Sequence, residues 1–232
     1  MWFAAVTATA LAYDVKRTAD GAPLRWELFP VPYGWAGGEP EVDAAEDELR
    51  AAFAAWSDVR GTPVGFERAP VGRAAPSESP DDANVVWITE SWPYDPDLLA
   101  LTSSWSDEDG TVVAFDVRVN GRVDWATDGD PDAFDFRAAM VHEVGHALGL
   151  EHSADDRASM YATAGHGETW RAVLSDDDEA GLRFLYPEVA PEPPADPSAL
   201  PWSCATGPGA PGALVSLLVL ALGARRPRRF PC

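Results

Sequence analysis

Residues 142–152 read HEVGHALGLEH and contain three of the four histidines in the chain. On an α-helix, His142 and His146 would project from one face about one turn apart, so both could bind a single ion. Glu143 lies beside this pair, where its carboxylate could act on a water molecule without ligating the ion. Gly149 permits the left-handed backbone that ends a helix and reverses the chain, which would bring His152 round as a third ligand.

Three imidazoles with one open position are typical of a catalytic zinc site, because structural zinc is normally closed by four protein ligands, usually including cysteine. The only two cysteines lie at the far end of the chain, at 204 and 232. A lone HExxH matches ordinary helices by chance, but the longer pattern HExxHxxGxxH fixes five positions in a chain poor in histidine. The segment therefore predicts zinc held by His142, His146 and His152, with Glu143 as the general base.

Three further blocks extend the pattern on both sides of the histidines. Serine follows the third histidine in HALGLEHS, and Met160 lies in the nearby stretch ASMYA. Upstream stands ELRAAFAAWSDV, and downstream stands LSDDDEAGLRFLYP. In these blocks and in their order the sequence resembles the matrixins, a family of metzincin metallopeptidases, over about residues 24–187.

The resemblance implies an α+β fold, a metzincin-like catalytic domain in which a mixed, twisted sheet accompanies an active-site helix and a C-terminal helix. It implies a zinc-dependent endopeptidase that acts on protein or peptide substrates. Met160 would form the methionine turn beneath the zinc, Leu101 would belong to an edge strand that binds the substrate backbone, and Tyr161 would line the specificity pocket.

The sequence also departs from the matrixin pattern. No cysteine-switch motif precedes the domain, so the sequence does not support latency through a zinc-bound cysteine. Matrixins often hold a second, structural zinc through further histidines, but His166 is the only histidine left over, so we do not expect that site here. Ala162 replaces the proline that commonly follows the Met-Tyr pair. His166 could instead assist catalysis, although a loop histidine is more often simply solvated.

The hydrophobic pattern predicts a strand–helix–strands order before the histidine segment. PLRWELFPVPY reads as a first strand, at or near a sheet edge because Pro30 interrupts it. Residues 43–56 form an amphipathic pattern, with Asp43 and Glu46 as a capping pair. Four short β-rich runs follow, VGFERAP, NVVWITES, LLALTSSW and TVVAFDVRVN, and the last two are joined by the hairpin signal SDEDG.

Charge excludes one class of partner and suggests an optional ion. The formal net charge of −21 argues against nucleic acid, since a phosphate backbone requires clustered Lys and Arg. Oxygen-rich side chains could hold structural Ca²⁺, although a solvated turn needs no metal. The residues concerned are Asp107, Glu108, Asp109, Asp116 and Asn120.

Beyond Pro187 the composition changes from globular to Pro-rich. A Cys, a thirteen-residue apolar run at 212–224 and the cluster RRPRR follow, an arrangement that resembles the C-terminal sorting tails of myxobacterial surface proteins. We therefore expect a secreted or surface-anchored bacterial monomer, with membrane contact through the tail. The expected parts are a truncated signal segment at 1–12, the metallopeptidase domain at 13–187, a linker at 188–203 and the tail at 204–232.

Two other classes of protein compete with an enzyme. A surface binding protein could keep the zinc and lack catalysis, but decayed enzymes commonly lose the glutamate, and Glu143 is present. A structural zinc module is disfavoured because no cysteine lies near the histidines.

Overall fold

A computed structural model describes residues 11–71, 79–81 and 83–188 of the chain. Most of the expected signal segment, nearly all of the linker and the whole tail lie outside these residues. Within the described residues, no helix has the length and apolar character that crossing a membrane requires.

The larger sheet of the fold contains both parallel and antiparallel strand pairs. In the described part of the chain it has five strands in the order β2-β1-β3-β5-β4, with parallel pairing except between β4 and β5. β4 is therefore an edge strand, and it forms a hairpin with β5 as the SDEDG signal predicts. The strands of this sheet are β1 (Val31–Gly38), β2 (Phe66–Arg68), β3 (Val85–Thr89), β4 (Ala100–Ser106) and β5 (Val112–Asn120).

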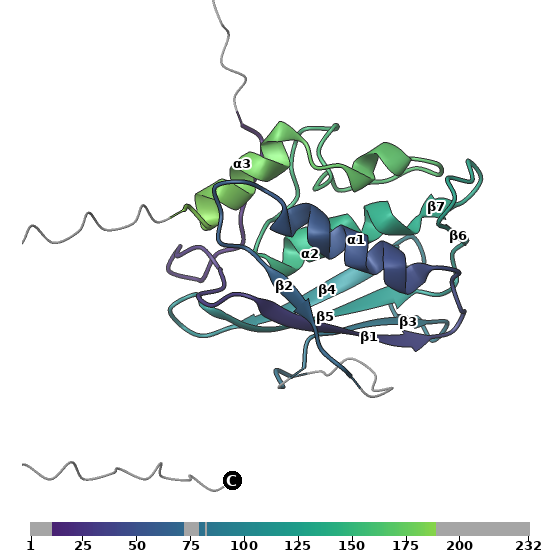
Figure 1. The fold of residues 1–232 in the computed structure, drawn as a ribbon, viewed down its shortest axis with the longest axis horizontal. Helices are drawn as coiled ribbons and strands as arrows, with labels where there is room; N and C mark the ends of the chain where they lie inside the picture. The colour runs from purple at the N-terminus through teal and green to yellow at the C-terminus, as the bar shows by residue number, and fades with distance from the viewer. Residues whose placement is uncertain (1–10, 72–78, 82, 189–232) are drawn as a thin grey trace, which may run out of the picture. The chain divides into compact units, whose positions relative to one another are not determined.

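The helices place the histidine segment over this sheet. Figure 1 shows α1 and α2 over the same face of the sheet, and α2 packs against both α1 and β4. A short pair of parallel strands, β6 and β7, leads into α2. The bounds are α1 (Ala45–Ser57), β6 (Trp125–Ala126), β7 (Phe134–Asp135), α2 (Phe136–Ala147), the 3₁₀ helix η1 (Thr169–Ala172) and α3 (Asp176–Leu185). The expected α+β fold, with a mixed sheet, the helix of the histidine motif and a C-terminal helix, is confirmed.

The amphipathic pattern of α1 is confirmed, but its predicted cap is wrong. The apolar residues of the pattern are all buried, among them Leu49, Phe53 and Trp56. The residue at the N-cap is Ala44, which has a left-handed backbone with φ 56° and no side-chain cap. Asp43 lies one residue too early to accept a hydrogen bond from the N–H groups of the first turn. The first turn instead contains acidic side chains, which interact favourably with the positive end of the helix dipole.

The first predicted strand is displaced along the sequence. β1 begins at Val31, and the preceding segment forms only two isolated bridges, Pro23 with Arg17 and Arg25 with Thr111. Trp26 in that segment donates from its indole nitrogen to the carbonyl of Ala147, 2.9 Å away, so the segment packs against the end of α2. β1 itself lies one strand from the sheet edge, next to the three-residue β2.

The buried core fixes the position of α2 from several sides. Trp56 of α1 is fully buried and donates from Nε1 to the carbonyl of Val141, at 2.9 Å. Asp135 caps the helix by accepting from the backbone N–H of Ala138, at 2.7 Å. Since these bonds involve the backbone of α2 itself, they fix the positions of His142 and His146 on this helix.

Candidate metal centre

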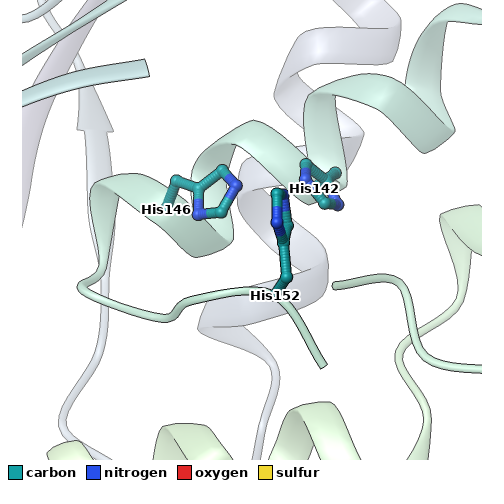
Figure 2. Close-up of side chains that lie close together, drawn as sticks. All are labelled: His142, His146 and His152. Carbon is teal, nitrogen blue, oxygen red and sulfur yellow. The ribbon is translucent and has the colours of Figure 1, made fainter. Parts of the chain in front are cut away.

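The three histidines of the motif converge in space. His142 and His146 project from one face of α2, and Figure 2 shows His152 facing them from the chain that follows the helix. The three rings can each offer a ligand nitrogen such that all three atoms lie within 4.8 Å of one another. Within the part of the chain that the structure describes, this is the one group of three or more metal-ligating side chains with such geometry.

The turn after α2 reverses the chain and so brings His152 to face the helix. Gly149 has φ +97°, and a Cβ added there would lie 2.3 Å from the backbone oxygen of Leu24. A side chain would thus be strained by the backbone angle and would collide with the first segment of the chain. The backbone N–H of Leu150 returns to the carbonyl of Gly145 at 3.0 Å, which closes the helix and reverses the chain.

Backbone carbonyls select the ring tautomers. Nδ1 of His142 lies 2.8 Å from the oxygen of Ser159, and Nδ1 of His146 lies 2.9 Å from the oxygen of Leu150. A carbonyl can only accept, so Nδ1 carries the hydrogen in both rings and Nε2 keeps its lone pair. Burial also lowers the pKa of all three histidines, that of His146 well below its ordinary value, which favours the neutral ring that binds metal.

Glu143 is buried next to the histidines and contacts the edge strand. The hydroxyl of Thr102 on β4 lies 2.5 Å from Oε2 of Glu143 and 3.1 Å from its carbonyl oxygen. Burial raises the pKa of Glu143 to about 7, while the hydrogen bond from Thr102 and the positive charge of Lys16 act in the opposite direction. The carboxyl group therefore lies where it can accept and release a proton near neutral pH.

Met160 lies beneath α2. A Cβ added at Gly145 would be 2.2 Å from its sulfur, so this glycine allows the methionine to approach the helix closely. Asp178 of α3 accepts from the backbone N–H groups of Ser159 and Met160, at 2.8 and 3.0 Å. This carboxylate thereby fixes the same turn whose Ser159 carbonyl orients His142.

A cavity of about 460 Å³ opens beside the histidines. Leu101 of β4 and Tyr161 of the loop after Met160 both line it, as do Glu143 and the three histidines. Arg171 also lines it, paired with Glu168. The two residues expected to bind substrate thus share a cavity with the metal-ligating set.

Other predicted site residues lie outside the three-histidine group or accept hydrogen bonds from backbone N–H groups. The ring of His166 stacks edge-on against Phe134 with 4.2 Å between centroids, and it does not belong to the three-histidine group. In the acidic hairpin, Asp107 accepts from the backbone N–H groups of Asp109 and Thr111. Asp116 accepts from the N–H of Val85. These bonds connect the side chains to nearby backbone groups, and calcium stays a prediction.

Sequence reasoning missed the residues that orient the site. Thr102, Ser159 and Asp178 act through hydrogen bonds between segments far apart in the sequence, and no local pattern predicts those contacts. The alternation of side chains along β4 could have placed Thr102 on the same face as Ser104, but only the register shows that this face meets α2.

A family model supplies the decisive comparison. The matrixin model, of the peptidase M10 class, matches residues 37–187, which include all the histidines of the site and the turn of Met160. The chain belongs to the matrixin family. Matrixins are zinc-dependent, and the three-histidine group of this matrixin fits a zinc site.

Individual relatives agree with the family. The matrixin is 28% identical over 195 residues to metalloendoproteinase 2-MMP of Arabidopsis thaliana, an alignment that covers 75% of this chain and 48% of the relative. It is 30% identical over 179 residues to human matrix metalloproteinase-16, covering 73% of this chain and 29% of the relative. Human matrilysin is 36% identical over 97 residues, covering 42% of this chain and 35% of the relative. The chain spans less than half the length of each.

Proposed function

We propose that this matrixin is a zinc-dependent endopeptidase that hydrolyses peptide bonds in extracellular proteins. The observation that carries the proposal is the convergence of His142, His146 and His152 in a cavity that also contains Glu143. Family membership supports the same activity.

The donor set fits zinc. Three neutral imidazoles suit this ion, and a set of three protein ligands is typical of catalytic zinc, because it leaves a position for water or substrate. The hydrogen bonds from Nδ1 of His142 and His146 keep these rings in the tautomer that ligates through Nε2. When bound, zinc lowers the pKa of water towards 7 and polarises the carbonyl group of a peptide bond.

The residues of the chain perform the proton transfers. Glu143 accepts a proton from the attacking water through its carboxylate and then releases it to the nitrogen of the leaving amine. The water oxygen forms the new bond to the carbonyl carbon, and the bond from that carbon to the amine breaks. The buried position of Glu143 keeps bulk water from competing for the proton.

Substrate binding is assigned to the cavity beside the edge strand. Among the described residues β4 is paired on one side only, with β5, so an extended peptide could add to its other edge near Leu101. The loop that begins at Tyr161 would surround the side chain that follows the cleaved bond.

Location is the second part of the proposal. Secretion or surface anchoring through the tail at 204–232 is supported by its order of Cys204, apolar run and arginine cluster. We also propose that the parts of the chain divide at residues 12, 187 and 203, that the protein is a monomer, and that it is bacterial. Fractionation of cells that express the full chain would test the location, and an intact tail in the soluble cytoplasmic fraction would refute it.

The alternative is a surface protein that binds zinc without catalysis. Glu143 distinguishes the two, because a protein without catalysis has no need of a buried carboxylate beside the metal, where its burial is unfavourable.

An assay on an unstructured protein tests the proposed activity. Purified full chain should hydrolyse casein, lose that activity with a zinc chelator, and regain it on addition of Zn²⁺. Zinc binding without hydrolysis of casein or of a broad peptide library would favour the binding protein.

A further inference from the structure

Thr102 connects the edge strand to the carboxylate beside the histidines. It lies in the middle of β4, opposite Val117 of β5, and it is partly buried. Its hydroxyl is 2.5 Å from Oε2 of Glu143, whereas the hydroxyl of the next residue, Ser103, accepts from Arg118. The side chain of Thr102 is thus directed at α2.

The chemistry of this contact determines which carboxylate oxygen is engaged. A hydroxyl has one proton to donate, and an ionised carboxylate only accepts. A bond to a charged acceptor is shorter and stronger than one to a carbonyl, so the 2.5 Å contact with Oε2 takes the proton in preference to the 3.1 Å contact with the carbonyl of Glu143.

The second carboxylate oxygen has a different environment. Among the described residues, none forms a hydrogen bond to Oε1 of Glu143. Every fully buried side-chain oxygen in this part of the chain has a hydrogen-bond partner, so Oε1 is not fully buried. Oε1 is therefore open to the cavity that Glu143 lines together with the three histidines. The two oxygens have separate surroundings, one held by the strand and one free.

We propose that Thr102 is a positioning residue for the general base, holding Oε2 of Glu143 so that Oε1 is presented to the reacting water. The inference rests on the proposed function. Thr102 lies on the strand along which a substrate would bind, so the strand that orients the peptide also orients the base. A side chain with three rotatable bonds would otherwise sample several rotamers at this place.

A purely structural role gives different expectations. If Thr102 only fastened β4 to α2, its loss would lower stability and disturb the substrate strand, which would raise KM. A positioning role predicts a fall in kcat with KM little changed, because the edge of β4 keeps its backbone groups.

The test compares three variants of the zinc-loaded full chain. Thr102→Val keeps the shape and removes the hydroxyl, Thr102→Ser keeps the hydroxyl, and Ser106→Ala, at the exposed end of the same strand, is the control. We expect Thr102→Val to lower kcat about tenfold to a hundredfold with KM within roughly twofold and zinc content unchanged, as for loss of a hydrogen bond to a charged group. Thr102→Ser should regain most of the rate, and Ser106→Ala should match the unmodified chain.

A structural measurement separates this inference from the proposed function. Crystal structures of the zinc-loaded unmodified chain and of Thr102→Val should show Glu143 in one rotamer in the first and turned or disordered in the second. An unmoved Glu143 in Thr102→Val would overturn the inference whether or not the chain hydrolyses peptides. In an active chain, an unchanged kcat in Thr102→Val or an equal loss in Thr102→Ser would also overturn it, while the proposed function would stand.

Discussion

His142 and His146 each have one ring nitrogen engaged by a backbone carbonyl. The carbonyls belong to Ser159 and Leu150, which lie in the two turns that follow α2. The tautomer of each ring thus depends on where those turns place their oxygens, and the affinity for the proposed zinc would depend on segments that contribute no ligand.

The lowered pKa of His142 and His146 predicts a pH dependence of the metal-free chain. A group whose pKa falls on folding contributes stability above its unfolded pKa, here 6.5, and that contribution is lost as the pH falls through the lower folded value. We expect the Tm of the metal-free chain to decrease as the pH is lowered below 6.5. Histidine ring titrations by NMR provide the check, and midpoints at or above 6.5 for these two rings would contradict the prediction.

Replacement of the third ligand tests the assignment of His152. In His152→Ala two imidazoles from one helix remain and the site is open to water, so zinc affinity should fall by about a hundredfold or more. Competition with a chromophoric chelator measures the change. Unchanged affinity would mean that the third ligand is another residue, and His166→Ala would then be the variant to examine.

At the scale of elements, the turn at Gly149 joins α2 to the third ligand. The carbonyl groups at the end of α2 are bound by side chains, with Lys16 donating to His146 and Tyr186 donating to Leu148. These bonds satisfy the acceptors that a helix end leaves open. The chain that leads into the glycine is therefore held in place.

Gly149→Ala should destabilise the fold and weaken zinc binding together. The added Cβ meets the backbone oxygen of Leu24 in addition to the strain of a positive φ, so we expect a loss of about 2 kcal/mol or more in the free energy of unfolding. Gly61→Ala is the matched control, since Gly61 has φ +81° with nothing within 4 Å of the added atom. Chemical denaturation measures both variants, and an equal cost in the two would show that the clash contributes nothing.

The sequence predicts elements and ligands that depend on local patterns. The helix 45–57, the β4–β5 hairpin and the three histidines follow from spacing and turn chemistry. The start of β1 and the cap of α1 were predicted wrongly, because tertiary contacts of Trp26 and the left-handed Ala44 outweigh local preference. The roles of Thr102 and Asp178 depend on which distant segments meet in the fold, and local patterns in a single sequence do not predict those contacts.

At the scale of the whole molecule, segments near the two ends of the described chain meet. The hydroxyl of Tyr186, just after α3, accepts from the backbone N–H of Trp26 at 3.0 Å and donates to the carbonyl of Leu148 at 2.6 Å. Asp177 accepts from the N–H groups of Ala12 and Tyr13, at 2.5 and 3.1 Å. The segments around Ala12, Trp26 and Leu148 thus contact α3 and the residue that follows it.

A chain that ends at Pro187 should be folded and as active as the full chain. It keeps the buried Leu185 and the hydrogen bonds of Tyr186. A chain that ends at Arg183 loses both and should be about 3 kcal/mol or more less stable, since it exposes core surface and leaves polar groups unpaired. Thermal unfolding and casein hydrolysis compare the two, and an inactive chain ending at Pro187 would show that the domain extends further.

The central claim is that His142, His146 and His152 hold zinc while Glu143 performs the proton transfer. Glu143→Gln separates these roles, because it removes the base and leaves the three ligands in place. The most direct measurement is bound zinc and casein hydrolysis in the same samples of the unmodified chain and Glu143→Gln. We expect one zinc per chain in both and a loss of at least about a thousandfold in hydrolysis for the variant; undiminished hydrolysis, or loss of the zinc, would contradict the account.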